Sequence, residues 1–289
     1  MKIGVAIASR GRPDDIAVIL EMLREQTLPP ASIVLSVTGP SDLPPGTFDP
    51  GVRVITGTPG LCAQRNRALD ALEADCDVVV FYDDDFIPSR VALAGVAALF
   101  ETHLHVAGAT GLVLQDGVHE GGIGLAESKA IVRKFDTTRQ PAPGISEASF
   151  TYGCNMAFRM RAIAGLRFDE RLPLYGWQED VDFSARVAKR GAVVLADHFA
   201  GVHRGVTRGR SPGRALGYSQ IINPFYLVTK GTMSRAHAMR LMLRNLAANH
   251  WRALRPEPHI DRAGRAMGNW AGLFDLLQGK HQPENILRY

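Results

Sequence analysis

The sequence predicts an α/β fold with a mixed, mostly parallel sheet flanked by helices and followed by a helical carboxy-terminal extension. Apolar runs of strand length alternate with segments of helical periodicity over about the first 115 residues. A fully apolar run at 78–82 leads directly into three aspartates, and from Gly213 onward the periodicity is almost entirely helical. Such alternation favours parallel strands joined by helices on both faces of a sheet.

The individual elements follow from the same periodicity. Strands are predicted at residues 3–8, 33–37, 52–56, 78–82, 106–114 and 193–196, and helices at 14–26, 61–74, 89–101 and 177–190. Residues 115–148 have no clear period and are predicted to form a loop-rich stretch, of the kind that often carries variable binding surfaces.

Length and composition restrict the class of protein. The 289 residues allow one large domain or one domain with an appendage. No apolar run approaches the roughly 18 residues of a membrane span, and Arg10 soon follows the first run, so we expect neither a span nor a secretory signal. Cys62, Cys76 and Cys154 form no C-x-x-C pair, which predicts reduced thiols and a cytoplasmic location.

The basic charge is concentrated towards the carboxy terminus. Residues 1–200 hold 19 Lys and Arg against 25 Asp and Glu, whereas residues 201–265 hold 12 against 2. A basic block beside an acidic domain predicts an anionic partner for the block, such as phosphates or a membrane surface. The acidic balance of the larger part disfavours a nucleic-acid groove, and with it a metal-dependent nuclease.

Two acidic clusters carry the chemistry that the sequence predicts. Asp83, Asp84 and Asp85 follow a buried strand, and three adjacent carboxylates repel one another unless a cation is present. They predict a site for Mg²⁺ or Mn²⁺, with a solvated acidic turn as the alternative. Glu179 and Asp180 open a later helix, where one carboxylate can take a proton while the first cluster holds the metal.

Five segments occur in a fixed order along the first 230 residues. They are Ile-Gly-Val-Ala-Ile-Ala-Ser-Arg-Gly-Arg-Pro at 3–13, Gly-Leu-Cys-Ala-Gln-Arg-Asn at 60–66, Phe-Tyr-Asp-Asp-Asp-Phe-Ile-Pro at 81–88, Gly-Cys-Asn-Met-Ala-Phe-Arg at 153–159 and Glu-Asp-Val-Asp-Phe-Ser-Ala-Arg at 179–186. In this order they resemble the family 2 glycosyltransferases of the Rossmann-like GT-A fold. The resemblance implies an inverting enzyme that moves a sugar from a nucleotide diphosphate sugar to an acceptor hydroxyl.

The resemblance also implies a domain organisation. A GT-A catalytic domain is expected over residues 1–230, with a nucleotide-sugar half at about 1–115 and an acceptor half at about 116–212, followed by a basic amphipathic helical extension over 231–289. The Gln-x-x-Arg-Trp signature of processive members is missing, which indicates transfer of one sugar per encounter. Such members often serve polysaccharide or glycolipid assembly.

Matched residue by residue, the resemblance assigns roles at the acidic clusters. Asp83 and Asp85 match the outer acids of the family's D-x-D motif and would bind the cation, and His203 lies where many members have a histidine that completes the metal or diphosphate site. For His203, an ordinary surface histidine is the alternative. Asp180, beside Glu179, matches the acid that serves as general base on the acceptor hydroxyl.

The donor-binding residues that the resemblance implies come from the strand ends and from a glycine-spaced basic loop. They are Ser9, Arg10, Thr38, Arg65, Asp83, Asp84, Arg204, Arg208 and Arg210. Guanidinium groups match phosphate oxygens, so the loop arginines either close over a pyrophosphate or form a solvated basic loop. The family's acid after the second strand and aromatic residue after the first are missing, so a UDP-sugar is only the default donor.

A helix near residues 234–255 separates apolar from basic side chains. Met239, Met242, Leu243, Leu246 and Leu254 share one side, and His237, Arg240, Arg244, Arg252 and Arg255 lie opposite, with Leu241 and Trp251 among the arginines. Either the apolar side packs on the catalytic domain or on a second subunit of a homodimer, or the helix docks on an anionic membrane. Docking would favour a lipid-linked saccharide acceptor at the cytoplasmic face, and a carbohydrate is the other acceptor class.

Two further functions stay open on the sequence alone. A nucleotidyltransferase that makes nucleotide sugars also needs an α/β sheet and acidic ligands, but residues 8–12 do not supply its glycine-rich G-x-G-T-R-like loop. The other is a catalytically inactive homologue that binds sugar nucleotides. Asp83, Asp85 and Asp180 are all present, which argues against it.

Overall fold

The structure is a computed structural model that describes residues 1–138, 143–208, 212–255 and 257–289. The chain divides into two compact units. The first comprises Met1–Pro59, Ala63–Arg167 and Arg186–Gly209, and the second comprises Gly60–Cys62, Phe168–Ala185 and Arg210–Tyr289. The first unit holds the sheet, and the second holds the carboxy-terminal helices.

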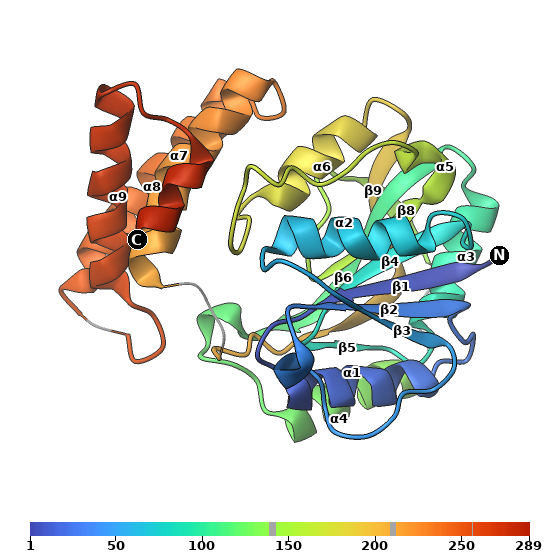
Figure 1. The fold of residues 1–289 in the computed structure, drawn as a ribbon. Coiled ribbons are helices and arrows are strands. Elements are labelled where there is room, and N and C mark those ends of the chain that lie inside the picture. Colours follow the sequence, from blue (N-terminus) through green and yellow to red (C-terminus); the bar gives the residue numbers. More distant parts are fainter. Residues whose placement is uncertain (139–142, 209–211, 256) are drawn as a thin grey trace. The chain divides into compact units, whose positions relative to one another are not determined.

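The first unit is built on a mixed sheet, which Figure 1 shows with α1 and α4 on one face and α2 on the other. Its strands are β1 Ile3–Ala8, β2 Ser32–Val37, β3 Val52–Thr56, β4 Val78–Asp83, β5 Phe86–Pro88, β6 Val106–Asp116, β7 Ile145–Glu147, β8 Asn155–Arg159 and β9 Ala192–His203. The strand order is β3-β2-β1-β4-β8-β6-β9-β5, and β7 pairs with β9. Because β1, β2, β3, β4, β6 and β9 run in one direction, the predicted mostly parallel sheet is confirmed for the described residues.

Helices cover the sheet where their apolar residues recur at helical spacing. They are α1 Pro13–Arg24, α2 Leu61–Leu72, α3 Ala92–Thr102, α4 Leu125–Thr137 and the short α5 Met160–Ile163. Helix α6 Glu179–Val187 begins in the second unit and ends in the first. In α1, Pro13 and two aspartates favour the helix start, and Ile16, Ile19, Leu20 and Leu23 bury one side against the sheet. Short 3-10 helices lie at Pro40–Asp42, Gly117–His119 and Pro283–Arg288.

The structure corrects two of the predicted elements and adds β5, β8 and α5, which were not predicted. Residues 115–148, predicted as loops, contain α4 and β7; α4 was missed because Ser128 and Val132 are its only buried residues, so its apolar stripe is narrow. Strand β9 extends to His203. The predicted strand ended at residue 196 because Asp197 and His198 interrupt the apolar pattern in the middle of β9.

The second unit contains the helices α7 Gly213–Lys230, α8 Arg235–Ala253 and α9 Arg262–Leu277, which lie side by side in Figure 1. The helical periodicity predicted from Gly213 onward is present, and α7 precedes the extension predicted over 231–289. Helices α7 and α9 approach until their backbones touch. A Cβ atom on Gly217 would lie 2.0 Å from the carbonyl oxygen of Arg265, and one on Gly268 would lie 2.0 Å from that of Arg214. No helix in the described residues is long and apolar enough to cross a membrane.

Candidate metal centre

The candidate site forms where strands of the first unit end at one edge of the sheet. Asp83 ends β4 and is paired in register with Ala8 at the end of β1. Asp116 and His203 end the neighbouring parallel strands β6 and β9 and are paired with each other. Ligands of open α/β sheets bind beyond the carboxyl ends of such strands. The register of the sheet therefore gathers these side chains at its binding edge.

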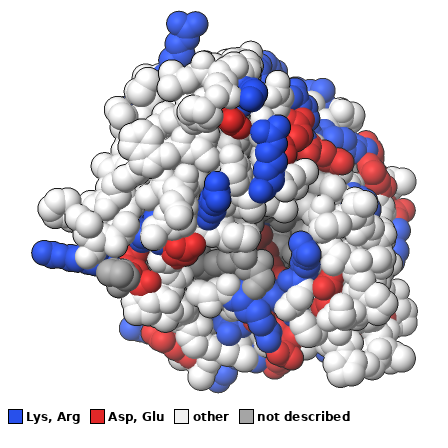
Figure 2. All heavy atoms as spheres, turned by 60° about the vertical axis from the view of Figure 1, so that its left-hand side comes forward, with Lys and Arg blue, Asp and Glu red and all other residues white. Residues whose placement is uncertain are grey.

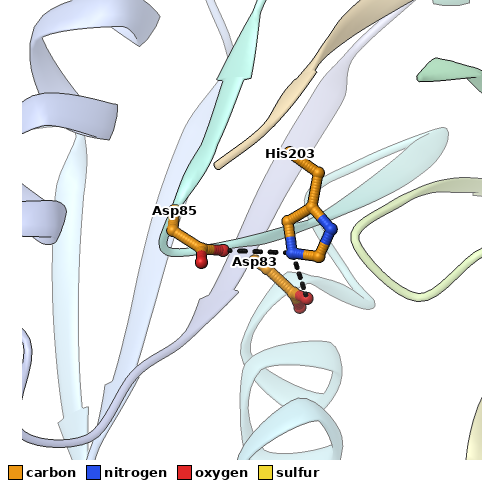
Figure 3. A group of neighbouring side chains, drawn as sticks. All are labelled: Asp83, Asp85 and His203. Atoms are coloured by element: carbon orange, nitrogen blue, oxygen red, sulfur yellow. Dashed lines mark ion pairs between the residues drawn. The ribbon is translucent and has the colours of Figure 1, made fainter. Parts of the chain in front are cut away.

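Asp83, Asp85 and His203 form a group that could hold a cation (Figure 3). Nε2 of His203 lies 3.3 Å from Oδ1 of Asp85 and 3.9 Å from Oδ2 of Asp83, and one ligand atom from each residue falls within 4.8 Å of the others. Neighbouring ligands of an ion held at about 2.1 Å lie about 3 Å apart, so a small shift suffices. The two carboxylates suit Mn²⁺ or Mg²⁺, and the imidazole is a ligand more typical of transition-metal ions.

His203 is oriented from the side opposite the two aspartates. Its Nδ1 lies 3.0 Å from Oδ1 of Asp116, and the hydroxyl of Tyr152 donates to the other oxygen of Asp116 at 2.7 Å. Although burial raises the pKa of Asp116, the hydrogen bonds from His203 and Tyr152 lower it to about 2. A carboxylate on Nδ1 leaves Nε2 facing the metal group, which is the usual outer-shell arrangement of a metal-binding histidine.

The ionisation of His203 bears on its use as a ligand. Burial favours the neutral imidazole, but the electrostatic interaction with Cys154 and the hydrogen bonds to Asp116 and Asp85 outweigh it and hold the pKa of His203 well above its usual value. For Asp85, burial raises the pKa, yet the contact with His203 and a hydrogen bond from the backbone N–H of Val206 lower it overall. A cation would therefore compete with a proton for Nε2 of His203.

Asp84, the middle acid of the triplet, points to different partners. Its carboxylate accepts hydrogen bonds from Ser9 Oγ at 2.6 Å and from Arg12 Nη1 at 2.7 Å. Burial first, and the neighbouring Asp85 second, raise the pKa of Asp84 to about 7, although Arg12 acts in the opposite direction. Arg12 also lies 3.7 Å from Asp85. This arginine therefore compensates charge in a triplet that otherwise repels itself.

The remaining strand-end residues of the predicted donor site lie in distinct surroundings. Arg65 is buried and donates from Nη2 to Asp83 at 3.0 Å and to the carbonyl of Gly153 at 2.9 Å. Arg10 is exposed. Thr38 donates from its backbone and its hydroxyl to Asp42. Of these, Arg65 lies directly against a candidate metal ligand.

The basic loop that was expected to close over a pyrophosphate is engaged with helix α1. Arg204 donates to Asp15 at 2.7 Å, and Arg208 lies 3.2 Å from Asp14. A Cβ on Gly205 would lie 2.4 Å from the backbone carbon of Gly117, and its φ of +67° favours glycine. This turn lets the next residue reach Asp85 through its backbone N–H. Arg210 lies outside the described residues.

Glu179 and Asp180 belong to the second unit, at the start of α6. Glu179 is buried, and Asp180 is partly exposed and accepts a hydrogen bond from the N–H of Val181 at 2.8 Å. The preceding loop holds Leu174 and Gln178 at positive φ, a backbone strain that tends to occur at functional sites. This strain singles out the loop before Asp180 but assigns it no chemistry.

Three residues of the site were not identified from the sequence. Two of them contact the metal group directly, Arg12 at Asp85 and Asp116 at His203. The third, Tyr152, contacts Asp116. Arg12 belongs to the opening segment 3–13 that carries the family resemblance. Its place near Arg10, a predicted donor-binding residue, was the signal that could have identified it. Asp116 ends a predicted strand region, as Asp83 does, but a single acid there carries no signal unless the strand pairing is known.

Comparisons with known proteins concern the fold. No protein-family model matches the chain, and no curated protein matches its sequence. The crystal structure of S. aureus TarS 1-349 matches with a TM-score of 0.56 and 15% identity, over 99% of this chain and 82% of that one. The TarS 1-349 complex with UDP-GlcNAc matches with a TM-score of 0.54 and 14% identity, over 83% and 70%.

A third match is GalNAc-T7 with UDP, GalNAc and Mn²⁺, with a TM-score of 0.50 and 14% identity, over 80% of this chain and 51% of that one. This chain therefore spans about half of the GalNAc-T7 chain, and between 42% and 82% of the TarS chains it matches. At these identities the likeness concerns the fold alone. The chain has a GT-A-like fold, with a mostly parallel central sheet flanked by helices, as the sequence predicted.

Proposed function

We propose that the protein is an inverting glycosyltransferase that moves one sugar from a nucleotide diphosphate sugar to an acceptor hydroxyl. The observation that carries the proposal is the convergence of Asp83, Asp85 and His203 at the carboxyl edge of a GT-A-like sheet. Solved structures with this fold were determined with UDP-GlcNAc, and with UDP, GalNAc and Mn²⁺, which supports a UDP-sugar as the first donor to test.

The proposed chemistry is a single displacement. A divalent cation held by Asp83, Asp85 and His203 would stabilise negative charge on a diphosphate leaving group. The acceptor oxygen forms a bond to the anomeric carbon, the bond from that carbon to the diphosphate breaks, and the electron pair leaves with the diphosphate. Asp180 takes the hydroxyl proton as general base, with Glu179 beside it. Displacement in one step inverts the anomeric carbon.

The remaining donor contacts are part of the proposal. Arg10 is exposed at the end of β1 and is proposed, with Ser9, Thr38, Arg65 and Asp84, to bind the nucleotide. Arg204 and Arg208 are proposed to exchange their aspartate partners on α1 for the diphosphate, since guanidinium groups match phosphate oxygens. For Arg210 the same role rests on the sequence alone.

The acceptor is proposed to be a carbohydrate or a lipid-linked saccharide, as in polysaccharide or glycolipid assembly. The proposed location is the cytoplasm, including the cytoplasmic face of the membrane. The three cysteines are buried and form no disulfide in the described residues, which supports a reducing compartment.

Thermal-shift measurements across UDP-, GDP- and dTDP-sugars test the donor site. One donor is expected to raise Tm only with Mn²⁺ or Mg²⁺, because ligand at 100 times its Kd adds about 2.7 kcal/mol of stability. The same mixture with acceptor sugars should release nucleoside diphosphate. Release of pyrophosphate from a nucleoside triphosphate and a sugar phosphate would show a nucleotidyltransferase instead. Stabilisation by a donor without any turnover across the panel would show an inactive binding protein.

A further inference from the structure

Helix α9 carries its large apolar side chains on the outside of the second unit. Met267, Trp270, Phe274 and Leu277 follow one another at intervals of three or four residues and therefore form one stripe along the helix. All four are exposed, from 56% for Met267 to 87% for Leu277. Helices of globular proteins normally turn such a stripe inward, so this one calls for an explanation.

Helix α8 continues this apolar surface. Met239, Leu243, Leu246, His250 and Leu254 recur at the same intervals, and Met239, Leu243 and Leu254 are exposed. The His250 and Trp270 rings meet edge to face, with centroids 5.8 Å apart, which joins the two helices at the stripes. We refer to these two stripes together as the α8–α9 apolar face.

The interior of the same helix group holds Tyr218, Ile221 and Ile222 of α7. Helices α8 and α9 meet them with glycines and polar side chains. Gly217 and Gly268 bring α7 and α9 into backbone contact. Asn249 donates to Gln220 at 2.7 Å and to Asn269 at 2.9 Å, and all three are buried. Helices α8 and α9 therefore leave Met239, Leu243 and the four apolar residues of the α9 stripe exposed to another surface.

The charged side chains of α8 itself are all basic, while Glu257, just beyond the helix, pairs with Arg252 and Arg262. Arg240, Arg244, Trp251 and Arg255 form the next stripe around α8, and all are exposed. Helix α8 contains no acidic residue, and Asp275 of α9 is buried and accepts a hydrogen bond from Tyr218 at 2.8 Å. Figure 2 shows this side of the molecule with basic side chains, acidic side chains near some of them, and broad areas without charge. Exposed apolar and aromatic residues edged by arginines are the composition of interfacial membrane helices.

We propose that the α8–α9 apolar face docks on an anionic lipid surface, with Trp270 and Phe274 inserted between headgroups and Arg240 and Arg244 against lipid phosphates. The arginines favour lipid over a second copy of the chain. A symmetric dimer through this face would bring the same arginines together without acidic partners, which is unfavourable. The docking does not depend on the transferase activity.

Co-sedimentation of the full chain with vesicles of phosphatidylcholine alone, or of phosphatidylcholine with phosphatidylglycerol, tests this surface. The protein is expected to bind the anionic vesicles and to dissociate as salt rises, because screening shortens electrostatic reach to about 3 Å at 1 M. Arg240→Glu with Arg244→Glu should weaken binding by about 30-fold or more, since each basic residue near an anionic leaflet contributes about fivefold. Trp270→Ser with Phe274→Ser should abolish binding, because the two side chains that are proposed to insert between headgroups are removed.

Matched controls separate this face from general effects. Arg161→Glu with Lys189→Glu makes the same charge change on exposed residues of the first unit, and Leu104→Ser removes a 67% exposed leucine there. Both controls should sediment with anionic vesicles as the parent protein does. Equal binding to neutral and anionic vesicles, or binding to neither, overturns the proposal. The parent protein could instead fail to bind vesicles and sediment as a dimer. If Trp270→Ser with Phe274→Ser then converts this dimer to a monomer, the face binds a second copy of the chain.

Discussion

Asp116 and His203 end two neighbouring parallel strands, and Oδ1 of the aspartate lies 3.0 Å from Nδ1 of the imidazole. Tyr152 holds the other oxygen of Asp116, so the carboxylate is fixed from two sides. The pair sets the orientation of a candidate metal ligand without itself joining the metal group. Asp116 is therefore a positioning residue, and its effect should appear in metal affinity.

Asp116→Asn is expected to lower the affinity for Mn²⁺ by about 10- to 100-fold, the usual effect of losing the outer partner of a metal-binding histidine. Isothermal titration calorimetry at fixed pH measures it. Tyr152→Phe removes only the hydrogen bond to the other oxygen and should change the affinity less. If Mn²⁺ binds equally well to Asp116→Asn and to the parent protein, His203 is not oriented by this contact.

The acids of the triplet are expected to differ in their effect on metal binding. Asp83→Asn and Asp85→Asn should abolish metal-dependent donor binding, because each removes an oxygen from the candidate group. Asp84→Asn should lose less affinity for Mn²⁺, because its carboxylate faces Ser9 and Arg12. Titration of each variant with Mn²⁺ and donor compares them. Equal losses at all three positions would contradict the assignment of separate roles.

The acids at the start of α6 are expected to separate chemistry from stability. Asp180→Asn should lower kcat by about 10²- to 10⁴-fold with donor affinity retained, as for loss of a general base. Asp182→Asn should instead lower stability, by about 2 kcal/mol, because its fully buried carboxylate binds Lys230 and Thr232 at 2.8 Å. Steady-state kinetics and thermal denaturation measure the two effects. An active Asp180→Asn beside an inactive Glu179→Gln would transfer the base to Glu179.

The ionised carboxylate of Asp42 should stabilise the fold at neutral pH, and this stabilisation should be lost in acid. It accepts hydrogen bonds from the backbone N–H groups of Gly11, Thr38 and Gly39; burial raises its pKa, but these bonds and the Thr38 hydroxyl lower it below the ordinary 3.8. Because the unfolded state then takes up the proton first, the stabilisation is present above pH 3.8 and is lost as pH falls through the lower folded pKa.

Thermal denaturation between about pH 2.5 and 7 measures this contribution. Asp42→Asn should lower stability at pH 7 by about 2 kcal/mol and show a shallower decline of Tm in acid, because one acceptor oxygen and the charge are gone. A parallel decline in both proteins would place the acid sensitivity in other carboxylates.

Gly268→Ala should separate α7 from α9. The added methyl group would lie 2.0 Å from the carbonyl oxygen of Arg214, which belongs to backbone and cannot move aside alone. We expect a loss of about 3 kcal/mol or more, measured by urea denaturation. Gly51→Ala is the matched control, because no atom lies within 4 Å of its added methyl group. Equal stability of both variants would mean that the two helices do not need their close contact.

The strands β1 to β4 and the acidic triplet could be predicted because their signals are local. Strands such as β4 are buried on both faces and therefore read as continuous apolar runs. Helix α4 could not be predicted in this way, since its buried side is limited to Ser128 and Val132. The positions of Asp83 and Asp85 after a buried strand were sufficient to expect a metal group, and the comparison with family 2 glycosyltransferases added His203.

The sequence by itself determined the α/β class, the helical stretch from Gly213 and the candidate ligands Asp83 and Asp85, because each depends on the order of neighbouring residues. Only the tertiary structure decided that Asp116, 87 positions from His203, orients it, and that Arg12 compensates Asp84. Strand register creates both contacts, and register is set by pairing over long distances. The exposure of the α8–α9 apolar face was decided in the same way, because glycine contacts between α7 and α9 determine which sides of these helices are buried.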